Sequence, residues 1–290
     1  MQSHSGTKPG DGETDEVLRE WRESACYWQK HLGTIRTMFA PLTRALIDEA
    51  GIVAGNSVLD VAGGSGEPSL TIAETVGPTG AVTCTDAIAE MVATAKVEAQ
   101  QRGLTNVKFQ QCTADSLPFE DKSFHAVVCR LGVMFFPDPL AALREMLRVT
   151  KDGGAISLVG WDKSELNPFF YAMTDVVARH FDDAPPADPN APGAFRFAEP
   201  GVLAGLVENA GATNVTERKL KFDIAAPISL QEFWQMRSEI SATLREKLGT
   251  LSQTEADLIA REVQDAVREF FPRGRMSIPA QTIIVSGRKR

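Results

Sequence analysis

The chain has 290 residues, of which 43% are hydrophobic and 23% are charged, so it can bury the large apolar core of a globular protein. Its formal net charge of -8 disfavours a surface built to neutralise nucleic-acid phosphates, because such binding depends on Lys and Arg contacts. No apolar run approaches the roughly 20 residues that span a bilayer, and residues 1–16 lack the apolar stretch of a signal peptide. We expect a cytoplasmic protein with a disordered tail over residues 1–15.

Residues 16–50 are predicted to form N-terminal helices, because apolar side chains recur three or four positions apart: Leu18, Trp21, Ala25, Trp28, Leu32 and Ile35, then Leu42, Ala45 and Leu46. Pro41 is expected to begin a new helix, since proline is well tolerated in the first helical turn. The four cysteines of the chain form no CxxC pair, which argues against a zinc cage or a redox motif. We therefore expect no metal centre.

From residue 57 onward, short apolar strands alternate with helical segments. The predicted strands are 57–62, 81–86, 107–112, 125–130 and 155–160. The predicted helices are 68–76, 88–102 and 139–149, and turns at 77–80, 102–103 and 151–154 punctuate the boundaries. This alternation predicts parallel βαβ units with right-handed crossovers, and hence an α/β fold with a doubly wound sheet.

The regular alternation ends after Trp161. A helix over 168–181 and a Pro/Asp/Ala-rich connector precede a helix over 199–210 and a strand over 213–224, and a helical stretch over 229–271 precedes a last strand over 281–287. We assign residues 51–161, 198–226 and 276–290 to one core, with helical insertions over 162–197 and 227–275. The insertions are expected to form a substrate lid at one end of the sheet, with a purely structural cap as the alternative.

The turn after the first strand, from Asp60 to Pro68, contains consecutive glycines that let a backbone approach a ligand closely. A dinucleotide fingerprint starting at Gly64 requires a glycine at position 69, which is Ser69, and a P-loop requires a lysine that this turn lacks. Asp60 ends the strand, where a carboxylate repels a pyrophosphate and favours a cationic ligand. The turn therefore disfavours a nicotinamide-dependent oxidoreductase and suits a sulfonium amino acid.

The stretch VLDVAGGSGEPSL resembles the first motif of class I S-adenosylmethionine-dependent methyltransferases, a family that includes the ubiquinone/menaquinone C-methyltransferases and many small-molecule enzymes. Ala62 stands where that family usually has its first glycine. The resemblance covers residues 57 to about 160 and implies a Rossmann-like, mostly parallel, seven-stranded sheet. It also implies S-adenosylmethionine as the cofactor, S-adenosylhomocysteine as its product, and helices over residues 16–50 that cover the cofactor.

The resemblance further implies roles for residues that follow successive strands. Asp86 would accept hydrogen bonds from both ribose hydroxyls, Asp115 would contact the adenine amino group, and Arg130 would lie near the methionine end. The full set of implied cofactor residues is Asp60, Ala62, Gly63, Gly64, Gly66, Asp86, Ala87, Met91, Ala114, Asp115, Ser116, Arg130 and Leu131. Considered alone, Asp86 is equally consistent with a helix cap and Asp115 with a turn.

A methyl group on a sulfonium is already activated, so the protein has mainly to align the acceptor with it. No catalytic residue follows from the fold, and the candidates for a base are His31, Tyr27 and His180. Candidates for the substrate side are Trp28, Trp161, Phe169, Phe170 and Arg273, with Arg237 and Arg275 as weaker ones. Ordinary packing or solvent exposure is the alternative for each of these side chains.

We expect a methyltransferase that moves a methyl group to an O, N, S or C atom of a small molecule and acts as a monomer or a homodimer. A quinone-precursor C-methyltransferase is the runner-up, which the overall resemblance suggests. A non-catalytic module that only binds the cofactor is the alternative from another class. Nucleic-acid methylation is disfavoured by the acidic charge and because the fourth strand is followed by Arg130-Leu131-Gly132-Val133 rather than by an Asn/Asp-Pro-Pro-aromatic sequence.

Overall fold

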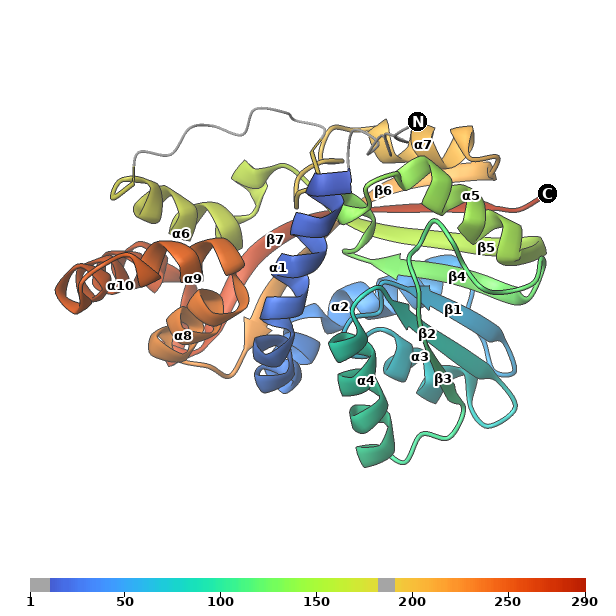
Figure 1. Ribbon diagram of the computed structural model, residues 1–290, viewed down its shortest axis with the longest axis horizontal. Coiled ribbons are helices and arrows are strands. Elements are labelled where there is room, and N and C mark those ends of the chain that lie inside the picture. The colour runs from blue at the N-terminus through green and yellow to red at the C-terminus, as the bar shows by residue number, and fades with distance from the viewer. Residues whose placement is uncertain (1–10, 182–190) are drawn as a thin grey trace, which may run out of the picture.

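The computed structural model describes residues 11–181 and 191–290, which form a seven-stranded sheet with the strand order β3-β2-β1-β4-β5-β7-β6. The strands are β1 (Ser57–Val61), β2 (Ala81–Asp86), β3 (Val107–Gln111), β4 (Phe124–Arg130), β5 (Thr150–Trp161), β6 (Thr213–Ala226) and β7 (Met276–Arg288). Strands β1 to β5 pair in parallel, whereas β7 runs antiparallel to both β5 and β6. The predicted doubly wound, mostly parallel α/β sheet is confirmed (Figure 1).

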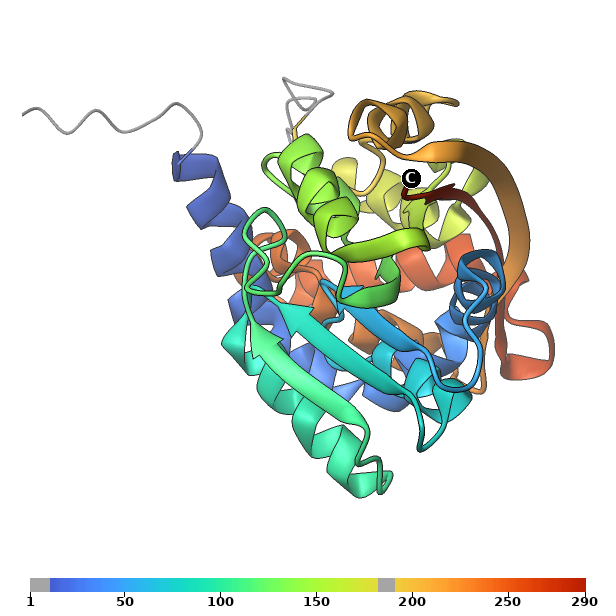
Figure 2. The same cartoon turned by 90° about the vertical axis from the view of Figure 1, so that its right-hand side faces the viewer.

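Helices cover both faces of this sheet. Helices α3 (Ser69–Val76) and α4 (Ala89–Gln101) connect β1 to β2 and β2 to β3, whereas α5 (Pro139–Val149) connects β4 to β5. The two sets of crossovers run in opposite directions along the sheet, so right-handed connections place α5 on the face opposite α3 and α4 (Figure 2). Helix α7 (Val202–Asn209) packs beside α5 on β6 and β7. Side chains without exposed surface, such as Val58, Val127 and Ile156, fill the core.

The N-terminal helices differ from the prediction in two places. Helix α1 (Asp11–Lys30) begins inside the predicted tail, because a helix extends outward from its apolar face at one hydrogen bond per residue; residues 1–10 lie outside the described residues. Helix α2 (Leu32–Ala50) contains Pro41, so the prediction of a new helix there is wrong. Buried Met38 and Leu42 flank the proline and continue one apolar face against the sheet, which maintains the helix.

Several segment ends also differ. Residues 151–154, predicted as a turn, belong to β5, because the N–H of Gly153 donates to the Lys289 carbonyl (2.9 Å) and the N–H of Lys289 donates to the Gly154 carbonyl (3.0 Å). Strand β7 begins at Met276 rather than at residue 281, since its first half pairs with β6. Short 3₁₀ helices span Val133–Phe135, Ser164–Leu166, Arg268–Phe270 and Pro272–Gly274.

Helices α6 (Pro168–Ala178), α8 (Leu230–Ile240), α9 (Ala242–Gly249) and α10 (Gln253–Val267) gather at one end of the molecule, and we name them the helical insert (Figure 1). The insert has its own small apolar cluster, in which Met173, Val177, Leu244, Ile259 and Val263 are buried. Helix α1 contacts α4 of the core and also α8 and α9, so it lies between the insert and the sheet. The predicted connector falls partly on residues 182–190, which lie outside the described residues.

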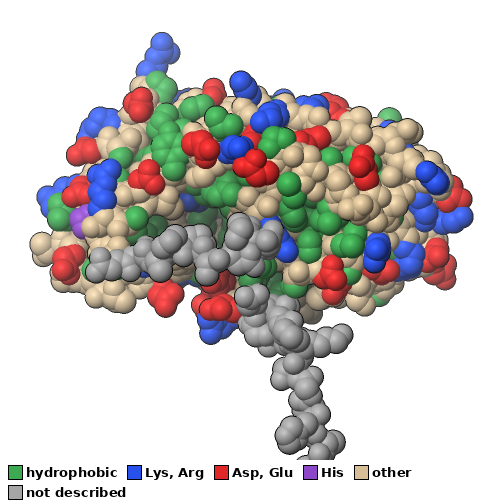
Figure 3. Space-filling model, turned by 90° about the horizontal axis from the view of Figure 1, so that it is seen from above, with side chains coloured by type: hydrophobic (Ala, Val, Ile, Leu, Met, Phe, Trp, Pro, Cys, Tyr) green, Lys and Arg blue, Asp and Glu red, His purple; other side chains and the backbone are tan. Residues whose placement is uncertain are grey.

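Two features concern possible partners: the length and apolarity of the helices, and the distribution of charge on one face. None of the described helices combines the length and apolarity required to cross a membrane. On the face seen in Figure 3, Lys and Arg side chains are interspersed with Asp and Glu side chains and do not gather into one basic patch. That face therefore lacks the concentrated positive charge typical of a nucleic-acid interface.

Candidate functional site

The order in which strands are added to the sheet reverses between β1 and β4. Strands β2 and β3 lie on the far side of β1, and β5 lies on the far side of β4. In such sheets ligands bind beyond the carboxyl ends of the strands at this point. A cavity of about 230 Å³ lies there, enclosed by the loops after β1 to β4 and by α1 and α2. Ten of the thirteen predicted cofactor residues line it: Ala62, Gly63, Gly64, Asp86, Ala87, Met91, Ala114, Asp115, Arg130 and Leu131.

The glycine-rich loop after β1 comes very close to its neighbours. A Cβ atom on Gly63 would lie 2.7 Å from Oδ2 of Asp60 and 2.8 Å from Sγ of Cys84, so only glycine fits there. Gly64 has a φ of 55°, in the left-handed region that glycine adopts without strain. Ala62 has a φ of 57°, the same region, which explains why the family usually has glycine at this position.

Asp60 does not line the cavity but lies fully buried beneath the loop. Its Oδ2 accepts hydrogen bonds from the backbone N–H of Ser69 (3.0 Å) and from the Ser69 hydroxyl (2.5 Å), while Oδ1 has no partner among the described residues. Burial raises the pKa of Asp60 to about 7, although the Ser69 hydrogen bonds and the charge of Arg130 oppose the rise. Asp60 therefore anchors the loop to the start of α3, and a direct contact with a cofactor is not part of this geometry.

Asp86 ends β2 and lines the cavity. Its Oδ2 accepts from the N–H of Gly64 and its Oδ1 from the N–H of Ile88, each at 2.9 Å. Burial raises the pKa of Asp86, and these backbone donors partly counteract the rise. The carboxylate thus joins the glycine-rich loop to the start of α4. Asp86 is not the N-cap of α4, because that residue is Ile88, but it holds the N–H of Ile88 immediately before the helix.

The loop after β3 contributes the outer part of the cavity wall. Asp115 is exposed and lines the cavity beside the half-buried Ala114, whereas Ser116 does not line it. Gly66, in the loop after β1, is the remaining predicted residue that is absent from the wall. Cys112 lines the cavity without having been predicted, and its position directly after β3 was the available signal.

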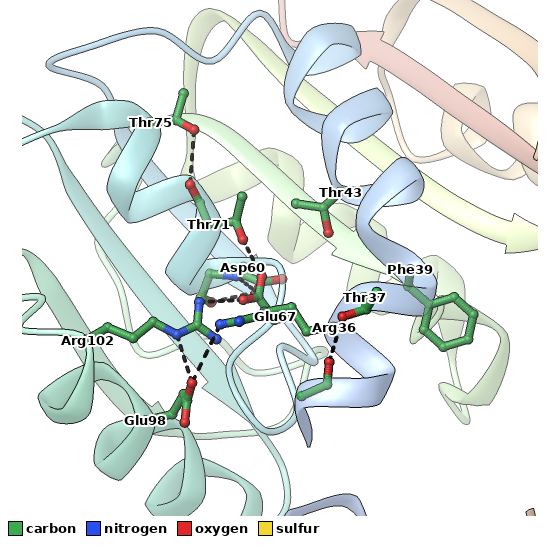
Figure 4. A network of polar contacts seen from close by, with 12 residues as sticks. Arg36, Thr37, Phe39, Thr43, Asp60, Glu67, Thr71, Thr75, Glu98 and Arg102 are labelled. Atoms are coloured by element: carbon green, nitrogen blue, oxygen red, sulfur yellow. Dashed lines mark hydrogen bonds and ion pairs between the residues drawn. The ribbon is translucent and has the colours of Figure 1, made fainter. Parts of the chain in front are cut away.

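Arg130 ends β4 and lines the cavity with its guanidinium already held in place. Nη1 donates to the Thr43 hydroxyl (2.8 Å), and Nη2 donates to the Glu67 carbonyl (3.0 Å). The Glu67 carboxylate accepts from Arg102 and from Thr71, each at 2.7 Å (Figure 4). Burial lowers the pKa of Arg130, while the nearby Glu67 and Asp60 charges raise it. This network fixes the position of Arg130 before any ligand arrives.

Apolar side chains close the cavity on the helical side. Helix α1 contributes Val17, Leu18, Trp21 and Trp28, and the Trp21 ring lies 5.6 Å from that of Trp28. It also lies 5.3 Å from Phe135, which follows β4. The indole Nε1 of Trp28 is buried without a hydrogen-bond partner among the described residues. Of these side chains only Trp28 was predicted as a site residue, although the apolar spacing along α1 and the aromatic pair after β4 are visible in the sequence.

The predicted catalytic candidates do not line the cavity. His31 Nε2 bonds Glu239 of α8 at 2.6 Å, and the Tyr27 ring lies under the guanidinium of Arg245 at 4.8 Å. Tyr27, near the end of α1, and His31, between α1 and α2, therefore both face the helical insert. His180, beyond α6, bonds Glu262 of α10 at 2.9 Å.

Four predicted substrate residues also lie away from the cavity wall. Trp161, Phe169 and Phe170 form an aromatic cluster that contacts Phe39, and Phe39 itself lines the cavity. The Phe39 ring thus lies between the aromatic cluster and the cavity. Arg273 is exposed in a 3₁₀ turn, as is the neighbouring Arg275.

Comparisons with known proteins agree with this geometry. A model of the ubiE/COQ5 methyltransferase family matches residues 42–180. An uncharacterized protein of Mycobacterium tuberculosis is 44% identical over 195 residues, which cover 66% of this chain and 68% of that protein. The ubiquinone/menaquinone biosynthesis C-methyltransferase UbiE of Hahella chejuensis is 37% identical over 136 residues, which cover 47% of this chain and 54% of that enzyme.

Among solved structures, the YcgJ protein of Bacillus subtilis shares the fold with a TM-score of 0.53 and 24% identity, covering 86% of this chain and 97% of that one. The sheet order and the glycine-rich loop at its reversal point define a Rossmann-like α/β fold. The sequence matches show in addition that the chain belongs to the class I S-adenosylmethionine-dependent methyltransferase family. It is accordingly a methyltransferase, and its cofactor is S-adenosylmethionine.

Proposed function

We propose that the cavity beyond β1 to β4 binds S-adenosylmethionine and that its methyl group passes to a small-molecule acceptor by in-line displacement. The observation that supports this most directly is one cavity that combines two carboxylates, Asp86 and Asp115, with the half-buried guanidinium of Arg130 and a closely packed glycine loop. An adenine, a ribose and an amino-acid end require these polar groups at separate places.

The proposed roles follow from the hydrogen-bonding positions that remain free on the side chains of the cavity wall. Each Asp86 oxygen already accepts one backbone N–H and retains a further acceptor position, so the two oxygens suit the two ribose hydroxyls. Asp115 is exposed on the wall and suits the adenine amino group. Arg130 suits the carboxylate of the methionine end. The unpartnered Nε1 of Trp28 is a donor for which a bound ligand would supply the acceptor.

We propose that alignment of the acceptor, rather than proton transfer by a dedicated base, carries the reaction. None of the three candidates for a base lies on the cavity wall, because His31 and His180 bond carboxylates elsewhere and Tyr27 packs against an arginine. Alignment of an activated methyl group with its acceptor is sufficient to lower the barrier by several kcal/mol, on the order of 7 or more.

Quinone-precursor C-methylation is the second candidate. The ubiE/COQ5 match favours it, as does the aromatic cluster behind Phe39, which suits a planar acceptor. However, the match ends at residue 180, before α8, α9 and α10. Most of the helical insert, which we propose to cover the acceptor, is therefore outside the region shared with those enzymes, and the acceptor is left to experiment.

Calorimetric titration of the purified chain with S-adenosylmethionine and S-adenosylhomocysteine, with NADH as the control ligand, tests the cofactor site. Asp86→Ala should weaken both sulfur ligands at least about a hundredfold, because two hydrogen bonds to a charged acceptor are lost. Asp175→Ala, at an exposed position of α6, is the matched variant and should bind as the wild type does. Equal binding by the Asp86 variant and the wild type would contradict the assigned site.

A second measurement separates an enzyme from a binding module. The chain is incubated with S-adenosylmethionine and a panel of acceptors that includes demethylated quinols, and the release of S-adenosylhomocysteine is followed together with acceptor mass. We expect one acceptor class to gain a methyl group, with the product absent in Asp86→Ala. Tight cofactor binding with no transfer to any acceptor would favour the non-catalytic module.

A further inference from the structure

Arg237 lies on the buried face of α8 and has neither an ion pair nor a side-chain hydrogen bond with any other described residue. It follows Phe233 by four residues, so both side chains project from the same side of the helix, and both are buried. Only 8% of Arg237 is exposed, yet no hydrogen bond or ion pair joins its guanidinium to another described residue, and its buried Nε is unsatisfied. Burial, with no opposing charge, lowers the pKa of Arg237 to about 10.

Other partly buried arginines of the described chain are paired. Arg102 donates to the Glu67 carboxylate, and Arg130 donates to the Thr43 hydroxyl and the Glu67 carbonyl. A charge taken out of water without a partner is strongly unfavourable, and proteins generally compensate it with an ion pair, a hydrogen bond or a ligand. Arg237 is therefore a buried cation that has neither an ion pair nor a side-chain hydrogen bond among the residues described.

The surroundings of Arg237 are aromatic. Its guanidinium lies 4.2 Å from the centroid of the Phe169 ring and 5.4 Å from that of Phe170. Phe170 is half-buried and lies 5.1 Å from Phe195, which is half-buried as well, so part of this apolar surface remains open. Phe169 in turn contacts Phe39, whose ring lies on the wall of the cofactor cavity.

We propose that Arg237 binds the anionic group of the methyl acceptor, a carboxylate or a phosphate, and that the acceptor's apolar body packs against Phe170 and Phe195. The inference rests on the proposed methyl transfer and narrows its acceptors to anionic molecules with an aromatic or otherwise apolar body. The anion supplies the missing partner of the guanidinium. The rings of Phe169 and Phe39, in that order, lie between this guanidinium and the cofactor cavity. Arg237 is thus a specificity residue for the acceptor.

Benzoate, phenyl phosphate and the neutral benzamide are the probes, titrated into the chain with and without saturating S-adenosylhomocysteine. The wild type should bind an aryl anion and bind benzamide at least tenfold more weakly. Arg237→Met should lose at least tenfold of the affinity for the anion, while Arg237→Lys retains part of it. Arg273→Met removes an exposed arginine and should behave as the wild type does.

The titration of S-adenosylhomocysteine is performed on every variant and reports both folding and the cofactor site. Unchanged cofactor affinity in Arg237→Met, with anion binding lost, is the expected result. Anion binding that is equal in Arg237→Met and the wild type would overturn the proposal, as would a wild type that binds neither anion at millimolar concentration. If the wild type itself does not bind S-adenosylhomocysteine, the proposed function is rejected, whatever the anion result.

Discussion

The two walls of the cavity differ in chemistry and in support. The sheet wall consists of loops at strand ends and presents Asp86, Asp115 and Arg130. The helical wall, from α1 and α2, presents apolar side chains such as Trp21 and Phe39. Polar groups at the ends of hydrogen-bonded strands have fixed positions, whereas apolar side chains exclude water over a broad surface. The difference indicates that recognition belongs to the sheet wall and sealing to the helical wall.

The two walls also differ in which part of the molecule supports them. The core supports the sheet wall, as the fully buried Cys84 and Cys129 beneath its loops illustrate. Helix α1 instead has polar contacts with the helical insert, since Lys30 bonds Glu239 at 2.6 Å and Ser24 accepts from Arg245 at 2.9 Å. We therefore expect changes under the sheet wall to affect stability strongly and changes in the helical wall to affect affinity more modestly.

The largest effect is expected from Asp60→Asn, beneath the sheet wall. The folded pKa is about 7, above the value near 3.9 of an unfolded Asp, so the folded state binds this proton more tightly. Stability from this group is present below pH 4 and is lost as the pH rises through 7. Each pKa unit corresponds to about 1.4 kcal/mol, so the loss is roughly 4 kcal/mol.

Urea denaturation of the ligand-free chain between pH 4 and pH 8 measures this effect. Over this range the free energy of unfolding of the wild type should fall by roughly 4 kcal/mol more than that of Asp60→Asn. Asp175→Asn, at an exposed position, should retain the wild-type slope. Parallel profiles for the wild type and the Asp60 variant would show that the buried carboxyl is not the origin of the pH dependence.

An intermediate effect is expected from Trp21→Ala in the helical wall. The substitution removes an aromatic surface from the cavity and two ring contacts, with Trp28 and Phe135. We expect the affinity for S-adenosylhomocysteine to fall about tenfold, or roughly 1.4 kcal/mol, by calorimetry. Trp234→Ala, which alters a tryptophan packed against the insert cluster, is the control and should retain cofactor affinity. Unchanged affinity in Trp21→Ala would remove α1 from the cofactor site.

The smallest effect is expected from Glu239→Gln, which loosens α1 from α8. Burial alone would raise the pKa of Glu239, but hydrogen bonds from Lys30, His31 and Gln235 outweigh it and lower the pKa to about 2. The stabilisation is therefore present above the unfolded value, near 4.3, and is lost as the pH falls towards 2. Lys30 is half-exposed, so we expect a loss of no more than about 1 kcal/mol at pH 7.

Thermal and urea denaturation of Glu239→Gln and the wild type should differ at pH 7 and coincide near pH 2. Glu165→Gln, at an exposed position without a comparable ion pair among the described residues, is the matched control and should match the wild type at both values. A difference that persists at pH 2 would mean that the carboxylate charge is not what joins the two helices.

The sheet wall was largely predictable from the sequence, because strand ends and turns have local signals. Predicted bounds for β2 and α5 agree with the structure, and ten of the thirteen residues predicted to bind the cofactor line the cavity. The exceptions, Asp60, Gly66 and Ser116, show the limit: a motif locates a loop but not the depth of each side chain within it. Burial of Asp60 depends on the packing of Gly63 and Cys84 above it.

The helical wall and the insert were harder to predict, because long-range packing decides which face of a helix meets which partner. Tyr27 and His31 are four residues apart in the sequence, but only the positions of α8 and α9 show that both side chains meet the insert. Pro41 likewise carries a local signal for a helix start, and the buried face around it overrides that signal. Arg237 was a weak candidate because its burial is invisible without the contact to Phe169.

The position of β7 has a consequence for the order in which the molecule assembles during synthesis. Strand β6 pairs with β7 and with no other strand of the described sheet, although α8, α9 and α10 lie between them in the chain. Ala226 and Met276, at the two ends of that long connection, come together as paired residues. A nascent chain can therefore complete β1 to β5 first, while β6 and these three helices acquire fixed ends only after residue 276 has left the ribosome, when pairing offsets the entropy of closing the loop.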